Sequence, residues 1–165
     1  MSRAWVFGDN IDTDQLAPGL YMKASIGELS RHCLELVDPT FAASVRPGDI
    51  VVGGRNFGMG SSREQAVQAL RHLGIAAVIA RSFAGIFFRN AYNLGLLALV
   101  SQHADRLRAG DELVIDARAG RIDNRSTSES IACEPVPDHL MALVEAGGLV
   151  PLLERRFRTA KEPAR

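Results

Sequence analysis

Apolar residues along this chain come in short runs and in longer periodic stretches, and each type predicts a different element. Short apolar runs bounded by glycine or turn residues predict buried strands. They lie at residues 3–7, 50–52, 76–80 and 96–100. Apolar residues at helical spacing predict helices. These lie at residues 25–36, 63–73, 83–93, 138–146 and 149–157.

The ends of these helices carry recognisable capping residues. Ser25 and Glu28 have the spacing of a capping box, and Asp38-Pro39 ends the helix that they begin. Ser82 is expected to cap the helix over 83–93, and Gly74 is expected to end the helix over 63–73.

The last third of the chain has a different pattern. Residues 112–134 contain short strands separated by turns such as Ala119-Gly120-Arg121, which predicts an antiparallel meander. Strand and helix alternate before it, which favours βαβ units. We find neither an internal repeat nor a low-complexity linker. The sequence therefore predicts an α/β fold in a single domain over residues 1–165.

Composition narrows the partners that this domain can have. The 165 residues are 47% hydrophobic and 23% charged, as in an ordinary globular protein. Nineteen basic and nineteen acidic residues cancel, which argues against nucleic acid and against an anionic membrane as partners. Basic residues gather only near the end of the chain, and we expect a frayed basic tail over 158–165. They are Arg155, Arg156, Arg158, Lys161 and Arg165.

Location and metal binding are also limited by the sequence. No apolar stretch is long enough to span a bilayer, and residues 1–7 do not resemble a signal peptide, so we expect a cytoplasmic protein without a membrane segment. Cys33 and Cys133 are far apart and are expected to be reduced and buried. The four histidines lack metal-ligand spacing, so no metal is expected. An iron–sulfur cluster needs at least three thiolates, so any cluster would have to lie on another chain.

The stretch from Gly58 to Glu64 is the first candidate for chemistry. Its glycines allow the backbone to approach a ligand closely, and the helix that follows offers unpaired N–H groups to an anion. Ser61 and Ser62 add hydroxyls, and Arg63 adds a planar group that matches a carboxylate. The stretch is neither a Walker A loop nor a dinucleotide fingerprint. A capping box formed by Ser61 and Glu64 is an equally good interpretation, and the two are compatible.

The acidic segment 9–14 is the second candidate. Asp12 and Asp14 have the chemistry of hard-cation ligands, but the sequence offers no ordered set of further oxygen ligands. Such segments are more often turns. Alternatively, one aspartate pairs with Arg63 and holds its guanidinium in place.

Several long motifs, in order, resemble the small subunits of 3-isopropylmalate dehydratase and homoaconitase. The similarity covers essentially the whole chain. The matching segments are Asp9–Pro18 with Tyr21-Met22, Gly54–Ala66, Ala80–Asn90 with Asn93–Leu96, and Glu145–Val150. The central one resembles the Ser-Ser-Arg motif that these proteins share with the swivelling domain of aconitases.

This resemblance implies a three-layer β/β/α swivelling domain of the aconitase type. It also implies a large partner subunit that carries a 4Fe-4S cluster, in a heterodimer or heterotetramer, with the active site between the chains. The implied reaction is dehydration and rehydration of a small malate-like hydroxy acid, as in leucine biosynthesis, and the implied role of the cluster iron is that of a Lewis acid on the leaving hydroxyl.

The same resemblance assigns roles within the site. Ser61 would be the base that removes a proton beside a carboxylate, and Ser62 and Arg63 would bind that carboxylate. Asp14 would have an orienting role. Three further motif positions are expected to support the site: Asn56, Gly60 and Gln65.

Position 23 varies with substrate in the family. An arginine there accompanies a substrate with a carboxylate-bearing side group, and an apolar residue accompanies the isopropyl group. Lys23 is cationic, and burying an unpaired ammonium beside an isopropyl group is unfavourable, unless the side chain points to solvent. The chain also has Met59 where cysteine is common, Gln65 where histidine is common and Gly85 where arginine is frequent. These departures suggest a paralogue with a different malate-like substrate.

The sequence therefore favours the small subunit of 3-isopropylmalate dehydratase and leaves several alternatives open. The chain could instead serve homoaconitase or a 2,3-dialkylmalate dehydratase, or a dehydratase that uses no cluster or a single metal ion. A non-catalytic structural or regulatory subunit is the alternative from another class. An RNA-contacting domain is disfavoured by the neutral charge and the 6% aromatic content.

Overall fold

Two sheets form the centre of the computed structural model, which describes residues 2–161. The larger sheet has four parallel strands in the order β1-β2-β3-β4. They are β1 (Ala4–Val6), β2 (Ile50–Val52), β3 (Ala77–Ala80) and β4 (Leu97–Val100). All four fall within the strands predicted from the apolar runs.

The parallel sheet explains why its central strands are apolar throughout. Every residue of β2 and β3 is buried, as expected for strands covered on both faces. Two helices connect these strands in βαβ units: α4 (Glu64–His72) between β2 and β3, and α5 (Gly85–Asn93) between β3 and β4. The predicted alternation of strand and helix in the middle of the chain is confirmed.

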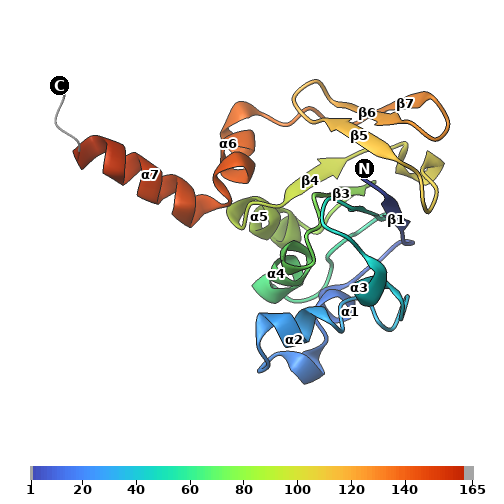
Figure 1. Ribbon diagram of the computed structural model, residues 1–165, viewed down its shortest axis with the longest axis horizontal. Coiled ribbons are helices and arrows are strands. Elements are labelled where there is room, and N and C mark those ends of the chain that lie inside the picture. Colours follow the sequence, from blue (N-terminus) through green and yellow to red (C-terminus); the bar gives the residue numbers. More distant parts are fainter. Residues whose placement is uncertain (1, 162–165) are drawn as a thin grey trace.

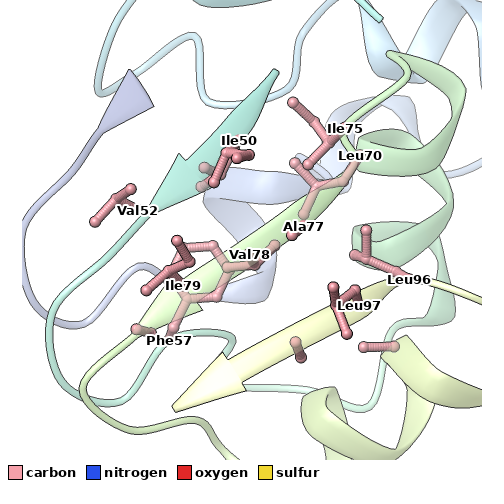
Figure 2. Close-up of a cluster of buried hydrophobic side chains, with 14 of the residues drawn as sticks. Ile50, Val52, Phe57, Leu70, Ile75, Ala77, Val78, Ile79, Leu96 and Leu97 are labelled. Carbon is pink, nitrogen blue, oxygen red and sulfur yellow. The ribbon is translucent and has the colours of Figure 1, made fainter. Parts of the chain in front are cut away.

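Side chains from α4 and from the sheet form the main core. On α4, Ala66, Val67, Ala69 and Leu70 are fully buried, one face of the helix. Figure 2 shows Leu70 beside the sheet residues and Phe57 close to Ile79. Phe57 lies in the loop that follows β2, so the loop that carries the candidate site is anchored in this core.

The smaller sheet is the predicted antiparallel meander, in the order β5-β6-β7. Its strands are β5 (Leu113–Asp116), β6 (Arg121–Asn124) and β7 (Glu129–Ala132), and a short 3-10 helix, Ala104–Arg106, precedes them. Figure 1 shows this sheet on one side of the parallel sheet, with α4 and α5 on the other side. This is the expected three-layer β/β/α arrangement.

The segment between β1 and β2 consists of short helices. They are α1 (Thr13–Leu16), a 3-10 helix (Gly19–Tyr21), α2 (Ile26–Ser30) and α3 (Phe41–Ser44). Ser25 accepts a hydrogen bond from the Glu28 backbone and begins α2 as predicted. However, the helix predicted to reach residue 36 ends at Ser30. Leu34 adopts a left-handed backbone, φ +59°, and its N–H donates to the carbonyl of Gln15 instead of continuing the helix.

Two caps that the sequence offered are not formed, because both serine side chains are used elsewhere. The N-cap of α4 is Arg63, and Ser61 contacts Thr13, so the capping box with Glu64, one of the two interpretations of this stretch, is wrong. The N-cap of α5 is Ala84, and the Ser82 hydroxyl accepts a hydrogen bond from the backbone of Asn56 at 2.9 Å.

The chain ends in two helices, α6 (Asp138–Ala146) and α7 (Leu149–Lys161). Helix α7 extends away from the rest of the molecule and has no buried residue (Figure 1). It is longer than the predicted 149–157, so the basic tail expected over 158–165 begins inside it; residues 162–165 lie outside the described residues. Within residues 2–161, no helix is both long and apolar enough to cross a membrane.

Candidate active site

Three loops meet at the carboxyl edge of the parallel sheet, where ligands bind in many open α/β folds. They follow β1, β2 and β3, and two isolated bridges join them, Asp12 to Met59 and Phe57 to Phe83. The bridges are supported by backbone hydrogen bonds such as Gly58 N to Ile11 O at 2.7 Å. The first two candidate segments, far apart in the sequence, therefore lie side by side.

Gly58 determines how the second of these loops can pass over α5. Its φ of +82° lies in the left-handed region, and a Cβ there would be 2.1 Å from Cγ of Phe87, a buried residue of α5. No side chain fits without moving Phe87 or the loop. The loop and the helix therefore approach closely at Gly58, and residues 59–62 that follow are exposed.

We expect Gly58→Ala to lower the free energy of unfolding by about 2–4 kcal/mol, because backbone strain and overpacking add. Urea unfolding followed by circular dichroism measures this change. Gly85→Ala is the matched control, since no atom lies within 4 Å of its added Cβ, and it should be close to neutral. Equal stability of both variants would show that the loop does not pack on Phe87 in this way.

Ser61 presents an exposed hydroxyl whose position is fixed by Thr13. The Thr13 Oγ1 accepts a hydrogen bond from the Ser61 backbone N–H at 3.1 Å and lies 3.2 Å from the Ser61 Oγ. Thr13 is buried, at 3% exposure. Since Thr13 Oγ1 already accepts from the backbone, its own proton is free to be donated to the Ser61 Oγ.

Arg63 is held by two contacts that both use the same nitrogen. Its Nη1 donates to Oδ1 of Asp14 at 2.8 Å and to the carbonyl of Ala17 at 3.1 Å. Among the described residues these are the hydrogen bonds of the guanidinium, so the N–H groups of Nη2 and Nε are available to a ligand. The arrangement fixes a carboxylate-binding group in advance.

Asp14 is the aspartate that pairs with Arg63, as one interpretation of the acidic segment proposed. The hydrogen bond from Arg63, and next the one from the backbone N–H of Gly19, lower the pKa of the Asp14 carboxyl from its ordinary value. Asp12 has a different role, because it caps α1: its carboxylate accepts from the backbone of Gln15, and the Gln15 side chain accepts from the backbone of Asp12.

The remaining predicted site residues are placed less tightly. Ser62 and Gly60 are exposed beside Ser61, and Asn56 holds a left-handed turn, φ +56°, in the same loop. Gln65 is half-buried on the first turn of α4. Lys23 is exposed, on the loop between the 3-10 helix and α2. For the side chains of Ser62, Gln65 and Lys23 the described residues provide no hydrogen-bond partner.

Thr13 is the site residue that the sequence analysis did not single out. Its side chain meets Ser61, 48 positions further along the chain, only because the β1 and β2 loops are bridged. In the sequence, Thr13 lies between Asp12 and Asp14, which were considered because of their charge. Its role could be recognised only from its contact with Ser61.

The described residues also limit what this chain binds by itself. Over residues 2–161 no group of three or more His, Cys, Asp or Glu side chains is arranged to hold a metal ion. Cys33 and Cys133 are both buried, which raises the pKa of each thiol and makes thiolate ligands unfavourable.

A hollow of ≈ 640 Å³ lies elsewhere, where Ile50, Ala77 and Leu97 at the amino ends of the strands face β5. It contains none of the residues that converge around Arg63. We place the site at the opposite, carboxyl edge, because fixed polar groups converge there on an exposed surface.

Comparisons with known proteins agree on one family. The family model described as the aconitase C-terminal domain matches residues 10–131. The chain is 49% identical over 162 residues to the 3-isopropylmalate dehydratase small subunit 1 of Methanopyrus kandleri, covering 97% of this chain and 95% of that one. It is also 49% identical over 150 residues to the methanogen homoaconitase small subunit of Methanothermobacter thermautotrophicus, covering 90% of this chain and 86% of that one.

A solved structure is similar over the whole fold. The crystal structure of 3-isopropylmalate dehydratase (LeuD) from Methanocaldococcus jannaschii superposes with a TM-score of 0.90. The two chains are 41% identical, and the match covers 98% of each. The three-layer fold predicted from the sequence is therefore confirmed by a solved relative.

Proposed function

We propose a function for this chain on the premise that it belongs to the family of the aconitase C-terminal domain. We infer that it is the small subunit of a two-chain hydro-lyase that dehydrates and rehydrates a malate-like hydroxy acid, with 3-isopropylmalate the leading substrate. The observation that carries the proposal is the group formed by the exposed Ser61 and Ser62 and the half-buried Arg63, with Arg63 fixed by Asp14.

The geometry supports a division of labour within this group. The substrate's carboxylate would accept hydrogen bonds from the Nη2 and Nε sides of Arg63 and from the Ser62 hydroxyl. Ser61 Oγ, in its oxyanion form, would take the proton from the carbon beside that carboxylate. A serine is a poor base in water, but the Arg63 cation and a hydrogen bond donated by the Thr13 hydroxyl favour the oxyanion.

The 4Fe-4S cluster that the family implies does not fit this chain. Such clusters are held by at least three thiolates, and the chain has two cysteines, both buried. We therefore assign the cluster to a large partner subunit that covers the carboxyl edge of the sheet, in a heterodimer or heterotetramer. The partner would also exclude water from the Ser61 and Arg63 groups and fix the substrate between the two chains.

Homoaconitase is the second candidate, and Lys23 is the observation that favours it. Lys23 is an exposed cation on the loop that begins beside Asp14, so it can meet a carboxylate on the substrate's side group. An isopropyl group offers this ammonium no partner. The similarity to a homoaconitase small subunit is as high as that to dehydratase small subunits.

To test this function, the chain is purified anaerobically together with a large subunit and assayed with a panel of substrates. Malates with 3-alkyl and 3-carboxyalkyl groups are supplied, and formation of the unsaturated acid is followed by ultraviolet absorbance. Turnover of at least one of these acids is the expected result. A well-assembled complex that turns over none of them would contradict the proposed function.

The same panel gives a prediction for Lys23. We expect Lys23→Ala to raise the KM for 3-carboxyalkyl malates about three- to tenfold and to leave the KM for alkyl malates unchanged, as for the loss of one partly exposed ion pair. Lys161→Ala, at the chain's other lysine, is the matched control and should change neither KM. Equal effects of Lys23→Ala on both classes would show that Lys23 does not select the substrate.

A further inference from the structure

The loop over residues 18–24, which carries Lys23, is held together mainly by its own backbone. Tyr21 N donates to Pro18 O at 3.0 Å, and Ala24 N donates to Tyr21 O at 3.0 Å. These local bonds shape the loop but do not fix it against the rest of the molecule. At its first end, Gly19 N donates to Asp14. Leu20 is 85% exposed, whereas the next residues, Tyr21 and Met22, are partly buried against the core.

A stacked aromatic pair adds a contact at Tyr21 that orients this part of the loop. The Tyr21 and His32 rings lie parallel, with an interplanar angle of 4° and centroids 3.6 Å apart. His32 belongs to the turns that follow α2, and its N–H donates to Leu29 O at 3.0 Å. Leu29 is fully buried, so the His32 backbone is tied to the core, and the imidazole packs on Tyr21, which is itself partly buried against the core.

Two carboxylates fix the orientation of the imidazole. The Nδ1 of His32 lies 2.7 Å from Oε2 of Glu35, and its Nε2 lies 3.4 Å from Oε1 of Glu28. A carboxylate only accepts, so both nitrogens donate together when the ring is an imidazolium. The hydrogen bond to Glu35, the largest cause, and that to Glu28 raise the pKa of His32 above its ordinary value. A cation stacked on a phenol ring is also attracted by the ring's face.

We propose that His32 is a positioning residue: its imidazole, held between Glu28 and Glu35 and stacked on Tyr21, fixes the 18–24 loop so that Lys23 meets the substrate's side group. The role of Lys23 in this statement rests on the proposed function. The stack itself does not, and it predicts a loop that opens less often than its exposure alone suggests.

The test combines a structural and a kinetic readout on His32→Ala and His32→Phe. Trypsin cleaves after Lys23, and mass spectrometry of the fragments that end at Lys23 reports how often the loop opens. His32→Ala should speed this cleavage about three- to tenfold, as expected for loss of one aromatic pair, while cleavage after the exposed Arg125 stays unchanged as an internal control. His32→Phe keeps a stacking ring and should remain within about twofold of the wild type.

In the assembled enzyme, His32→Ala should raise the KM for 3-carboxyalkyl malates by about the same factor, with kcat within about twofold of the wild type. Adding Lys23→Ala to His32→Ala should then raise KM little further, because both changes remove one interaction. A merely structural His32 would instead lower the melting temperature without this selective change in KM.

Two outcomes overturn the proposal in distinguishable ways. If Lys23→Ala raises KM but His32→Ala leaves both KM and the cleavage after Lys23 unchanged, His32 does not position the loop, and the proposed function stands. If Lys23→Ala itself changes no KM, Lys23 does not bind the side group of the substrate. The positioning role then falls with that part of the proposed function, whatever the cleavage rate.

Discussion

Ser61→Ala is expected to lower the kcat of the assembled enzyme by about 10³-fold, because it removes the group that we propose takes the proton from the substrate. The hydroxyl is exposed and its contact is with Thr13 rather than with the core, so the variant should fold normally. Steady-state kinetics at saturating substrate measures the loss, and the KM should change much less than kcat.

The control for Ser61→Ala is Ser44→Ala, at an exposed serine of α3, which should retain full activity. Size-exclusion chromatography should show that Ser61→Ala still associates with the large subunit. A Ser61→Ala complex that keeps more than about a tenth of the wild-type kcat would favour the alternative that this chain is a structural or regulatory subunit.

Arg63→Gln is expected to lower kcat/KM by about 10²- to 10³-fold, since it removes the charged group that we propose binds the carboxylate and favours the neighbouring oxyanion. Arg63→Lys should recover little of this loss, because an ammonium cannot make the paired, planar contact. Initial rates at substrate concentrations well below KM give the ratio directly.

Two further variants test the anchor of Arg63 and the specificity of the effect. Asp14→Asn leaves the guanidinium in place but weakens its anchor, so a smaller loss of about tenfold in kcat/KM is expected. Arg89→Gln, at an exposed arginine of α5, should be neutral. Similar kinetics for Arg63→Gln and Arg89→Gln would show that Arg63 does not bind the substrate.

The parallel sheet could be predicted well because burial leaves a simple signal in the sequence. β2 and β3 are covered on both faces, so their residues are apolar without alternation, and the helix between them has one apolar face. The late meander was recognised from its turns. None of these predictions required knowledge of a distant contact.

The elements that were predicted wrongly depend on such distant contacts. Ser61 and Ser82 have the sequence positions of helix caps, but the hydroxyl of Ser61 meets Thr13 and that of Ser82 meets Asn56. The helix begun at Ser25 stops early because Leu34 bonds to Gln15, in a different helix. Cap propensity is a local preference, and tertiary hydrogen bonds override it.

In the candidate site, too, the local motifs could be predicted from the sequence, but the contacts between distant residues could not. The Ser-Ser-Arg stretch and the acidic segment could be found from residue types and from family resemblance. The residues alone left open whether Asp12 or Asp14 pairs with Arg63, while the family resemblance gave the orienting role to Asp14. The structure distinguishes them because Asp12 is used to cap α1, which leaves Asp14 for the guanidinium.

The central claim, that this surface is half of an active site, is tested most directly by mixing the purified chain with a cluster-loaded large subunit under anaerobic conditions. We predict that each chain alone is inactive and that dehydratase activity rises on titration and saturates as the complex forms. Full activity from this chain alone, or activity of the large subunit that is unchanged by adding it, would contradict the account.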